Sequence, residues 1–489
     1  METVFRYNQV VPRIGLVLHS IDGFNPAAKD ACEASYRRYF TQLVDSGLVD
    51  RGSLICGRLR HPWEASEAAD RLAAAQVDLV VNANVAFPNG QVFLTLATHP
   101  QLSRTPLAVI ADPEPKGVEW ATNAWCGVIM NNFVAKQLGR AIVTLPGPVT
   151  AEAFQTQFGR LLRVARAIKL LRKDYLCRFG DAPSGFHSAT GDPVAFAGVF
   201  GTRVDTVDLT AVMEAKRSRR VSGYLGEASF SDADLQATMA QVGSGRRVAV
   251  EADMLRRGVE LYHAYRAIIR ANGYTSAAFR CWPEFNEPYI STSACMAMGL
   301  LLANGDLTAA GCEGDWPVAV VQTIGTLLSG KPAACLDFVN YTAGSEIIQL
   351  GHCGMGICGQ MAANDPAAGS APRDAVVVHP VLRQIGKTIG PVHVGQFRFG
   401  PKTGLCIRQG PEGKFQILSF SGTSTPATEK GMTYSATDVQ VKDPVKLDRL
   451  ILEHGFPHHL AVAMEDISAE VRMLCAYLGV EHVSPDGDQ

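Results

Sequence analysis

A chain of 489 residues is too long for one hydrophobic core, so we expect about two to four domains. Hydrophobic residues make up 47% of it and charged residues 19%, a balance that is ordinary for a globular enzyme and excludes predominant disorder. The 45 Lys and Arg nearly cancel the 47 Asp and Glu, and the net charge of -2 gives no general attraction to nucleic acid or to an anionic membrane. We therefore expect a globular protein whose partner is neither nucleic acid nor a membrane.

The chain shows no sign of export or of membrane insertion. No uncharged run reaches the about 20 residues that cross a bilayer. Residues 1–11 contain Glu2 and Arg6 and lack the apolar centre of a signal peptide, so we expect a cytoplasmic protein. The 12 cysteines are too sparse for a disulfide scaffold, and most lie in apolar contexts that predict reduced, buried thiols. Cys353 and Cys358 are the only close pair, which alone is weak support for zinc.

Short apolar runs alternate with helical patterns in the first third of the chain. Residues 13–19, 77–82 and 106–111 are predicted as buried parallel strands, and residues 26–47 and 63–75 as helices. This alternation predicts a doubly wound sheet, in which ligands gather beyond the carboxyl ends of the strands. The side chains of His19, Asn82, Asn84 and Asp112 lie at or just past such ends. No glycine-rich nucleotide motif follows a strand, so we expect no nucleotide cofactor.

A long helix over residues 150–173 precedes a second α/β unit. Its predicted strands are residues 175–179, 203–209 and 248–252, and its helix over residues 253–272 ends at Gly273.

From about residue 378 the pattern changes to short alternating strands, punctuated by Gly and Pro, which predict an antiparallel barrel or sandwich. These strands cover residues 392–399, 403–408, 415–422 and 438–442, and a helix over residues 468–478 ends the chain. The expected fold is thus two Rossmann-like α/β domains, residues 1–171 and 172–345, followed by a C-terminal β-barrel-like domain with a terminal helix, residues 346–489.

Four residues stand out as candidates for metal chemistry. Glu313 lies in Glu-Gly-Asp-Trp, and Asp337 follows it by 24 residues, a strand–helix–strand spacing that can bring both carboxylates to one sheet edge. His352 follows the apolar stretch 347–350, and His459 is the second residue of a His-His pair. Two carboxylates with one or two imidazoles suit Mn²⁺, Mg²⁺ or Co²⁺, although spacing alone leaves solvated surface acids as the commoner explanation.

These residues resemble the metal core of the L-fucose and L-arabinose isomerases. The Glu-Gly-Asp-Trp segment matches the arabinose enzymes, and Asp337, His352 and His459 match the remaining ligands in order. Asp at position 337 is similar to the fucose enzymes, but the chain lacks much of their longer C-terminal region. The chain therefore resembles a divergent member of this family, whose substrate can be a modified sugar.

The resemblance implies an aldose–ketose isomerase that works through an ene-diol. It assigns Glu313 and Asp337 as acid/base groups that also bind a divalent metal, together with His352 and His459. We expect Mn²⁺ in first place, with Mg²⁺ or Co²⁺ as alternatives. The resemblance also implies a homo-oligomer, a trimer or a hexamer, with the active site near a subunit interface. Asp315 is expected to support Glu313 or His352.

Five further residues are candidates for contacts with a sugar. They lie at a strand end, in loops or beside a proposed ligand: His19, His187, Glu284, Asn286 and His458. Two other functions remain open. One is a metal-dependent epimerase or lyase that enolises an acidic or sulfonated sugar. Extra cationic residues in the pocket, for which Arg280 and Lys402 are candidates, would favour this function. The other is a non-catalytic sugar-binding protein, which would need no metal.

Overall fold

The computed structural model describes residues 6–114, 117, 120–284, 290, 292–341, 344–361, 374–379, 390–425 and 434–487. The chain forms two compact units. The smaller unit comprises Asn8–Leu170 and Ala469–Val480, and the larger unit comprises Met1–Tyr7, Leu171–Ser468 and Glu481–Gln489.

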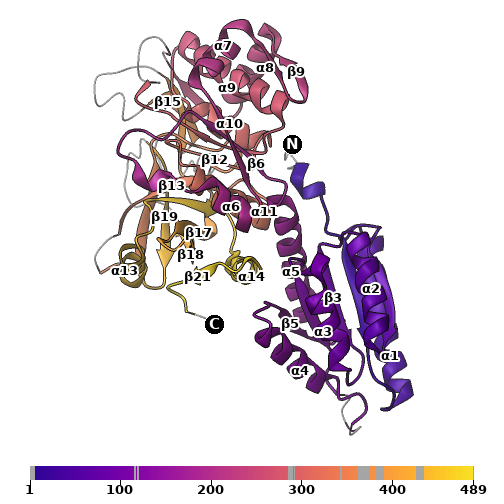
Figure 1. Ribbon diagram of the computed structural model, residues 1–489. Helices are drawn as coiled ribbons and strands as arrows, with labels where there is room; N and C mark the ends of the chain where they lie inside the picture. The colour runs from indigo at the N-terminus through magenta and orange to yellow at the C-terminus, as the bar shows by residue number, and fades with distance from the viewer. Residues whose placement is uncertain are drawn as a thin grey trace. The chain divides into compact units, whose positions relative to one another are not determined.

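The smaller unit is a doubly wound α/β domain with a five-stranded parallel sheet (Figure 1). Its strands, in sheet order, are β2 (Leu54–Leu59), β1 (Ile14–His19), β3 (Leu79–Asn84), β4 (Leu107–Ala111) and β5 (Val143–Pro146). Its helices are α1 (Pro26–Asp45), α2 (Pro62–Ala74), α3 (Gly90–Thr98), α4 (Ala124–Gln137), α5 (Glu152–Leu171) and α14 (Ser468–Leu478), with the short η2 (Pro100–Leu102) after α3.

The sheet of the smaller unit is covered on both faces because successive apolar side chains of each strand point to opposite faces of the sheet. Leu16 and Leu18 of β1 join a core with α1 and α5, whereas Val17 joins a second core with α2, α3 and α4. Strands buried on both faces are typical of parallel sheets and explain the continuous apolar runs of the sequence. The strand order reverses direction between β1 and β3, the point at which doubly wound sheets usually place ligands.

The larger unit contains a second parallel sheet of four strands. In sheet order these are β12 (Ala310–Gly311), β11 (Ser276–Phe279), β6 (Tyr175–Phe179) and β7 (Arg203–Val207). The helices of this region are α6 (Pro193–Val199), α7 (Leu209–Ser218), α8 (Asp232–Gly243), α9 (Ala252–Asn272), α10 (Cys295–Ala303) and α11 (Trp316–Ser329). Short elements complete it: η1 (Arg6–Gln9), η3 (His187–Ala189) and the hairpin of β8 (Arg220–Gly223) with β9 (Gly226–Ser229).

Six antiparallel strands close into a barrel in the C-terminal part of the larger unit. In order they are β17 (Gly400–Gln409), β20 (His459–Ala463), β13 (Ala334–Tyr341), β14 (Ile347–His352), β19 (Ser435–Val441) and β18 (Phe415–Thr425), and β18 pairs back with β17. The strand β21 (Glu481–Val483) adds to β18 in parallel, and α13 (Pro444–His454) precedes β20. The predicted combination of Rossmann-like sheets and a C-terminal barrel is therefore confirmed.

Three sequence predictions placed a segment in the wrong sheet. The strand predicted at residues 248–252 is β10 (Arg247–Ala249), and that at 392–399 is β16 (Pro391–Gly395). Both pair with β15 (Asp374–Val378) in a separate three-stranded sheet rather than with the parallel sheet or the barrel. Asp337 was expected just after a strand at the edge of the α/β sheet, but it lies within the barrel strand β13. A short apolar run has the same pattern in any of these sheets, because the pattern records burial and not the pairing partner.

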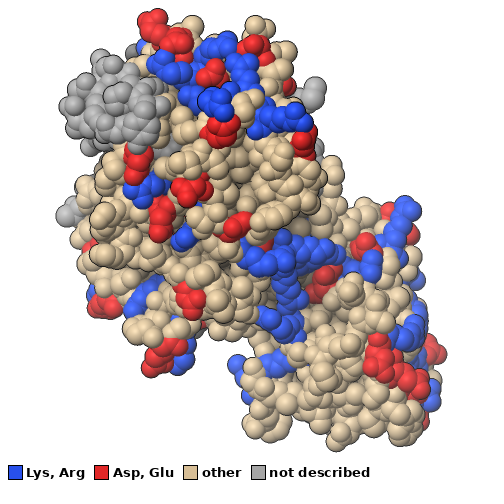
Figure 2. Space-filling model, turned by 45° about the horizontal axis from the view of Figure 1, so that its top comes forward, with Lys and Arg blue, Asp and Glu red and all other residues tan. Residues whose placement is uncertain are grey.

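The surface over α7, α8 and α9 carries both signs of charge in alternation (Figure 2). Arg256 lies 2.7 Å from Asp232 of α8, and Arg217 lies 2.7 Å from Glu214 within α7. Such exposed pairs contribute little to stability, but they neutralise this layer of helices. None of the helices in the described ranges is both long enough and apolar enough to cross a membrane.

Candidate functional site

The Glu-Gly-Asp-Trp segment forms a tight turn between β12 and α11. Glu313 has φ +55° and Gly314 has φ +70°, so two consecutive residues adopt the left-handed conformation. The turn is held by hydrogen bonds from the Gly314 N–H to the Phe279 carbonyl and from the Asp315 N–H to the Cys312 carbonyl, both 2.9 Å. A non-glycine residue in this conformation is strained, and such strain persists where the surrounding structure enforces it, commonly at functional sites.

Asp315 caps the helix that follows the turn. Its Oδ1 accepts the N–H of Val318 at 2.9 Å, and Trp316 and Pro317 occupy the first helical positions, where the missing N–H of proline costs nothing. Its second oxygen, Oδ2, lies 2.9 Å from Nδ1 of His459. Both side chains are fully buried. One carboxylate therefore starts α11 and also fixes the orientation of the His459 ring.

The barrel brings the other three predicted ligands next to Glu313. Asp337 on β13 pairs in register with His459 on β20 and with Gly351 on β14. His352 is the last residue of β14, so it lies one position further along the neighbouring strand. Adjacent antiparallel strands hold opposed side chains within about 5.5 Å. The four residues predicted from the sequence as metal ligands are thus gathered at one place.

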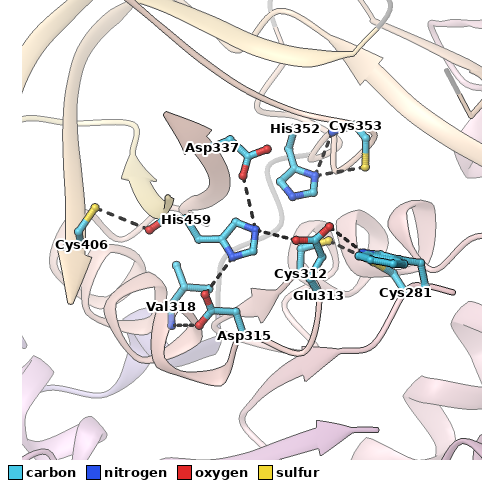
Figure 3. A network of polar contacts seen from close by, with 11 residues as sticks. Cys281, Cys312, Glu313, Asp315, Val318, Asp337, His352, Cys353, Cys406 and His459 are labelled. Carbon is cyan, nitrogen blue, oxygen red and sulfur yellow. Dashed lines mark hydrogen bonds and ion pairs between the residues drawn. The ribbon is translucent and has the colours of Figure 1, made fainter. Parts of the chain in front are cut away.

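The contacts among these four residues are centred on Nε2 of His459 (Figure 3). This nitrogen lies 3.3 Å from Oε2 of Glu313 and 3.5 Å from Oδ1 of Asp337. The ring centroids of His352 and His459 are 5.7 Å apart. Ligand atoms of Asp337, His352 and His459 lie within 4.8 Å of one another, and so do those of Glu313, His458 and His459.

The concentration of carboxylates makes the site attractive to positive charge. Burial disfavours the charged form of His459, but the hydrogen bond with Asp315 and the nearby Glu313 and Asp337 raise its pKa to about 10. Burial would raise the pKa of Glu313, yet His459, His352 and the Trp282 indole lower it below its ordinary value. Glu313 is therefore ionised at neutral pH.

The donor atoms fit a hard divalent cation. Three buried atoms of the cluster, Oδ1 of Asp337 and Nε2 of both His352 and His459, have no hydrogen-bond partner among the described residues. Buried polar atoms without a partner are uncommon and call for an explanation such as an ion. Two carboxylates and two imidazoles, with Nδ1 of His459 held by a carboxylate, are the donor set and the supporting contact expected of such a centre.

The structure adds contacts that the sequence did not indicate. Asp315 contacts His459, whereas the sequence led us to expect that it would support Glu313 or His352. The Trp282 indole donates to Oε1 of Glu313 at 2.9 Å and leaves Oε2 facing His459. The ring of Phe186 contacts those of Trp282 and His458, at centroid distances of 5.3 and 6.0 Å. The sequence offered one hint of these contacts, which is the presence of Trp282 among the polar residues of the segment 281–288.

The remaining predicted sugar contacts have different surroundings. His458 is exposed, and its ring lies beside Glu313 and tilted by 35° against that of His459, with a centroid distance of 4.2 Å. His187 lines an open cavity of about 240 Å³ together with Arg408, and Pro457 of the same cavity directly precedes His458. Glu284 forms a two-point ion pair with Arg280, at 2.5 and 2.6 Å, and within the described part of the chain it makes no hydrogen bond or ion pair with Glu313. Asn286 lies outside the described residues.

Arg280 and Lys402, the two cationic residues that the sequence suggested as substrate contacts, both form hydrogen bonds within the protein. Arg280 donates to Glu284 and to the carbonyls of Asp181 and Ala182. Lys402 is buried, and its ammonium donates to the carbonyl of Arg398 at 2.7 Å. Burial lowers the pKa of Lys402 to about 8. Both side chains are thus tied to local structure rather than extended toward a ligand.

His19 belongs to the smaller unit, where it forms part of a buried polar cluster. It lies at the carboxyl end of β1 with Asn82 and Asn84 at the end of β3, and all three side chains are inaccessible to solvent. Nε2 of His19 accepts the N–H of Asn89 at 3.0 Å, whereas its Nδ1 has no partner among the described residues. Oδ1 of Asn82 and Nδ2 of Asn84 are likewise unpartnered there. The cluster occupies the edge of the sheet at which doubly wound domains bind polar ligands.

Comparison with known proteins gives one consistent likeness. No family model matches the sequence. A protein of Clostridium sp. (strain MSTE9) named sulfoquinovose isomerase is 25% identical over 410 residues, which cover 82% of this chain and 85% of that protein. A protein of the same name from Alkalicoccus urumqiensis is 25% identical over 405 residues, or 81% and 83% of the two chains. Both alignments are longer than either compact unit, so the chain is similar along most of its length to two proteins named sulfoquinovose isomerase.

Proposed function

We propose that this protein is a metal-dependent aldose–ketose isomerase of the fucose and arabinose isomerase type that acts on a sulfonated sugar. The observation that carries the proposal is the convergence of Glu313, Asp337, His352 and His459, where three buried donor atoms make no hydrogen bond among the described residues. The likeness to two sulfoquinovose isomerases supports the reaction and the substrate class. The same likeness favours an enzyme over a non-catalytic sugar-binding protein.

The residues that would hold the metal are Glu313, Asp337, His352 and His459. Mn²⁺ is the first choice, with Mg²⁺ and Co²⁺ as alternatives, because carboxylate and imidazole donors suit all three. When bound, such a cation polarises the substrate carbonyl and stabilises the negative charge that develops on the sugar oxygens. The fixed ring of His459 and the enforced turn at Glu313 hold two of these donors ready in advance.

Glu313 and Asp337 are the proton-transfer groups of the proposed reaction. In the direction from aldose to ketose, a carboxylate removes the proton of C2, and a proton is returned to C1. The hydroxyl proton of C2 moves to the oxygen of C1, so the carbonyl passes from C1 to C2 and the atoms balance. Glu313 can act as the base because it is ionised, and the Trp282 N–H fixes Oε1 while Oε2 faces the centre beside His459. Proton transfer by positioned carboxylates commonly contributes about 10²–10⁴-fold to the rate.

Groups around the centre are proposed to bind the rest of the sugar. His458 lies against His459, and the cavity with His187 and Arg408 begins one residue away, at Pro457. An imidazole and a guanidinium there are suitable donors for an anionic substituent. His19 and its polar neighbours in the smaller unit are a further proposed sugar contact, and we propose a homo-oligomer in which they serve a site near a subunit interface.

The proposal is tested with metal-stripped protein resupplied with Mn²⁺ in D₂O. Sulfoquinovose and a panel of neutral aldoses and ketoses are followed by NMR, which reports the product and the deuterium at C1 or C2. We expect metal-dependent ketose formation with exchange from the sulfonated sugar. An epimer or a cleaved product would instead identify an epimerase or a lyase.

The variant Glu313→Gln tests the role of the carboxylate. We expect its turnover to fall by at least about 10²-fold with the fold retained, because the amide cannot accept the proton. Glu412→Gln is the matched control, since Glu412 is an exposed glutamate that forms an ion pair with the exposed Lys414. Wild-type activity in Glu313→Gln would refute the mechanism, whereas inactivity of the wild-type protein on all sugars would refute the function.

A further inference from the structure

A second group of donor atoms lies outside the proposed isomerase centre. The sulfurs of Cys295 and Cys353 and a ring nitrogen of His379 all lie within 4.8 Å of one another. Cys295 and His379 are buried, and Cys353 is partly exposed. The three residues come from three different elements: the first turn of α10, the residue after β14 and the residue after β15. Residues distant in the sequence thus form a compact group.

The donor set differs in kind from that of the isomerase centre. Two sulfurs and one imidazole are the ligands that select zinc-class cations over Mn²⁺ or Mg²⁺. Three protein ligands and an open fourth position are a common zinc geometry.

Apolar packing is the simpler account of the two thiols. Cys295 joins Val392 and Val394 in a small apolar cluster, against which Cys353 and Val377 pack. Free cysteines are often buried as small hydrophobic residues. Apolar packing does not, however, require an imidazole nitrogen within 4.8 Å of both sulfurs. Two sulfurs and an imidazole nitrogen gathered within 4.8 Å of one another are the arrangement that a bound cation would need.

We propose that Cys295, Cys353 and His379 bind a zinc-class divalent cation at a site separate from the proposed isomerase centre. The cation joins α10 to the end of the barrel strand β14 and to the three-stranded sheet of β15. No step of the isomerisation uses these residues, so the proposal does not depend on the proposed function, although the Cys353 sulfur lies 3.4 Å from Nδ1 of His352 of the isomerase centre.

The test titrates the reduced, metal-stripped full-length protein with Co²⁺ and follows thiolate-to-cobalt charge-transfer absorption. We expect a thiolate band that saturates within about two equivalents, because the isomerase centre also accepts Co²⁺, and that Zn²⁺ abolishes by competition. Cys295→Ser should remove the band, and His379→Gln should weaken Co²⁺ binding at least about tenfold. His379→Gln leaves both sulfurs in place, so it keeps the test decisive should Cys295→Ser fail to fold.

Two control variants separate this site from other thiols and from the isomerase centre. Cys126 is exposed and is therefore open to adventitious metal, so Cys126→Ser should keep the band. Asp337→Asn should also keep it while losing isomerase activity. A wild-type protein without a thiolate band, or a band unchanged in both Cys295→Ser and His379→Gln, would overturn the proposal.

Discussion

The two roles of Asp315 lead to a prediction about a conservative substitution. Its carboxylate accepts at both oxygens, from the Val318 N–H at 2.9 Å and from Nδ1 of His459 at 2.9 Å. An asparagine has only one acceptor oxygen, so Asp315→Asn must lose one of these contacts. If the amide oxygen keeps the helix cap, its NH₂ group faces Nδ1 of His459 and favours the ring tautomer with the proton on Nε2. That nitrogen is then no longer available as a ligand.

The magnitude follows from the two contacts. A lost helix cap costs about 1 kcal/mol, and a buried donor left without a partner costs about 1–3 kcal/mol. We therefore expect Asp315→Asn to lower the unfolding free energy by about 1–3 kcal/mol and Asp315→Ala, which loses both contacts, by about 2–4 kcal/mol. Loss of the group that orients a metal-ligating histidine commonly weakens metal binding by about 10–100-fold, and we expect this of both variants.

Urea unfolding of the metal-stripped protein and Mn²⁺ titration by calorimetry measure these two effects separately. Asp443→Asn is a suitable control, because Asp443 caps α13 through the Lys446 N–H in a part of the larger unit remote in sequence from the centre. It should change stability only slightly and leave Mn²⁺ affinity unaltered. Asp315→Asn with wild-type Mn²⁺ affinity and activity would refute the inferred role of Asp315.

Three further predictions concern the turn, the cavity and the dependence of stability on pH. Gly314 has φ +70°, and a Cβ there would lie 2.9 Å from the backbone N and Cα of Ala182. Gly314→Ala should therefore lower the free energy of unfolding by about 1–3 kcal/mol and reduce activity. An unchanged urea midpoint would contradict this prediction. His187→Ala should raise KM for a sulfonated sugar about tenfold with kcat retained, and equal KM values for variant and wild type would remove His187 from the substrate site. Burial opposes ionisation of Asp205, but hydrogen bonds from Tyr274, Thr206 and Tyr175 outweigh this and lower its pKa. The ionised carboxylate therefore stabilises the folded state above about pH 4, and this stabilisation is lost as the pH falls further. Unfolding free energies measured between pH 6 and 2 should fall more steeply for the wild type than for Asp205→Asn, and parallel curves would contradict the assignment.

The sequence was most informative where burial alone decides the structure. The strands β1, β3, β4 and β6 were predicted because a strand covered on both faces is a continuous apolar run. The helix α9 was predicted to its last residue, since Gly273 at φ +76° is the residue type that ends helices in the left-handed conformation. Edge strands leave a weaker pattern: Leu54–Leu59 of β2 contains Gly57 and Arg58 and was not predicted.

The candidate ligands could be recognised from motifs, but their supporting contacts could not. Which side chain faces Nδ1 of His459 depends on where β20 lies relative to the turn before α11, and these segments are more than a hundred residues apart in the sequence. The pairing of Asp337 with His459 likewise arises from barrel closure, which no local pattern reports. The left-handed conformation of Glu313 could not be predicted either, because the only sign of it in the sequence is the glycine that follows.

The end of β14 carries one donor for each of the two proposed centres. A ring nitrogen of His352 lies within 4.8 Å of ligand atoms of Asp337 and His459, and the sulfur of the next residue, Cys353, lies within 4.8 Å of that of Cys295 and 3.4 Å from Nδ1 of His352. Nδ1 of His352 accepts the Cys353 N–H at 2.9 Å, and the neutral ring then carries its proton on Nε2. A cation at Nε2 needs the lone pair of that nitrogen, so the proton must move to Nδ1 or leave. A proton on Nδ1 would face the Cys353 N–H, and the backbone at Cys353 must then shift. Because the same residue supplies a sulfur to the second group, we expect the two centres to influence each other's affinity, which reciprocal titrations of Mn²⁺ and Zn²⁺ would measure.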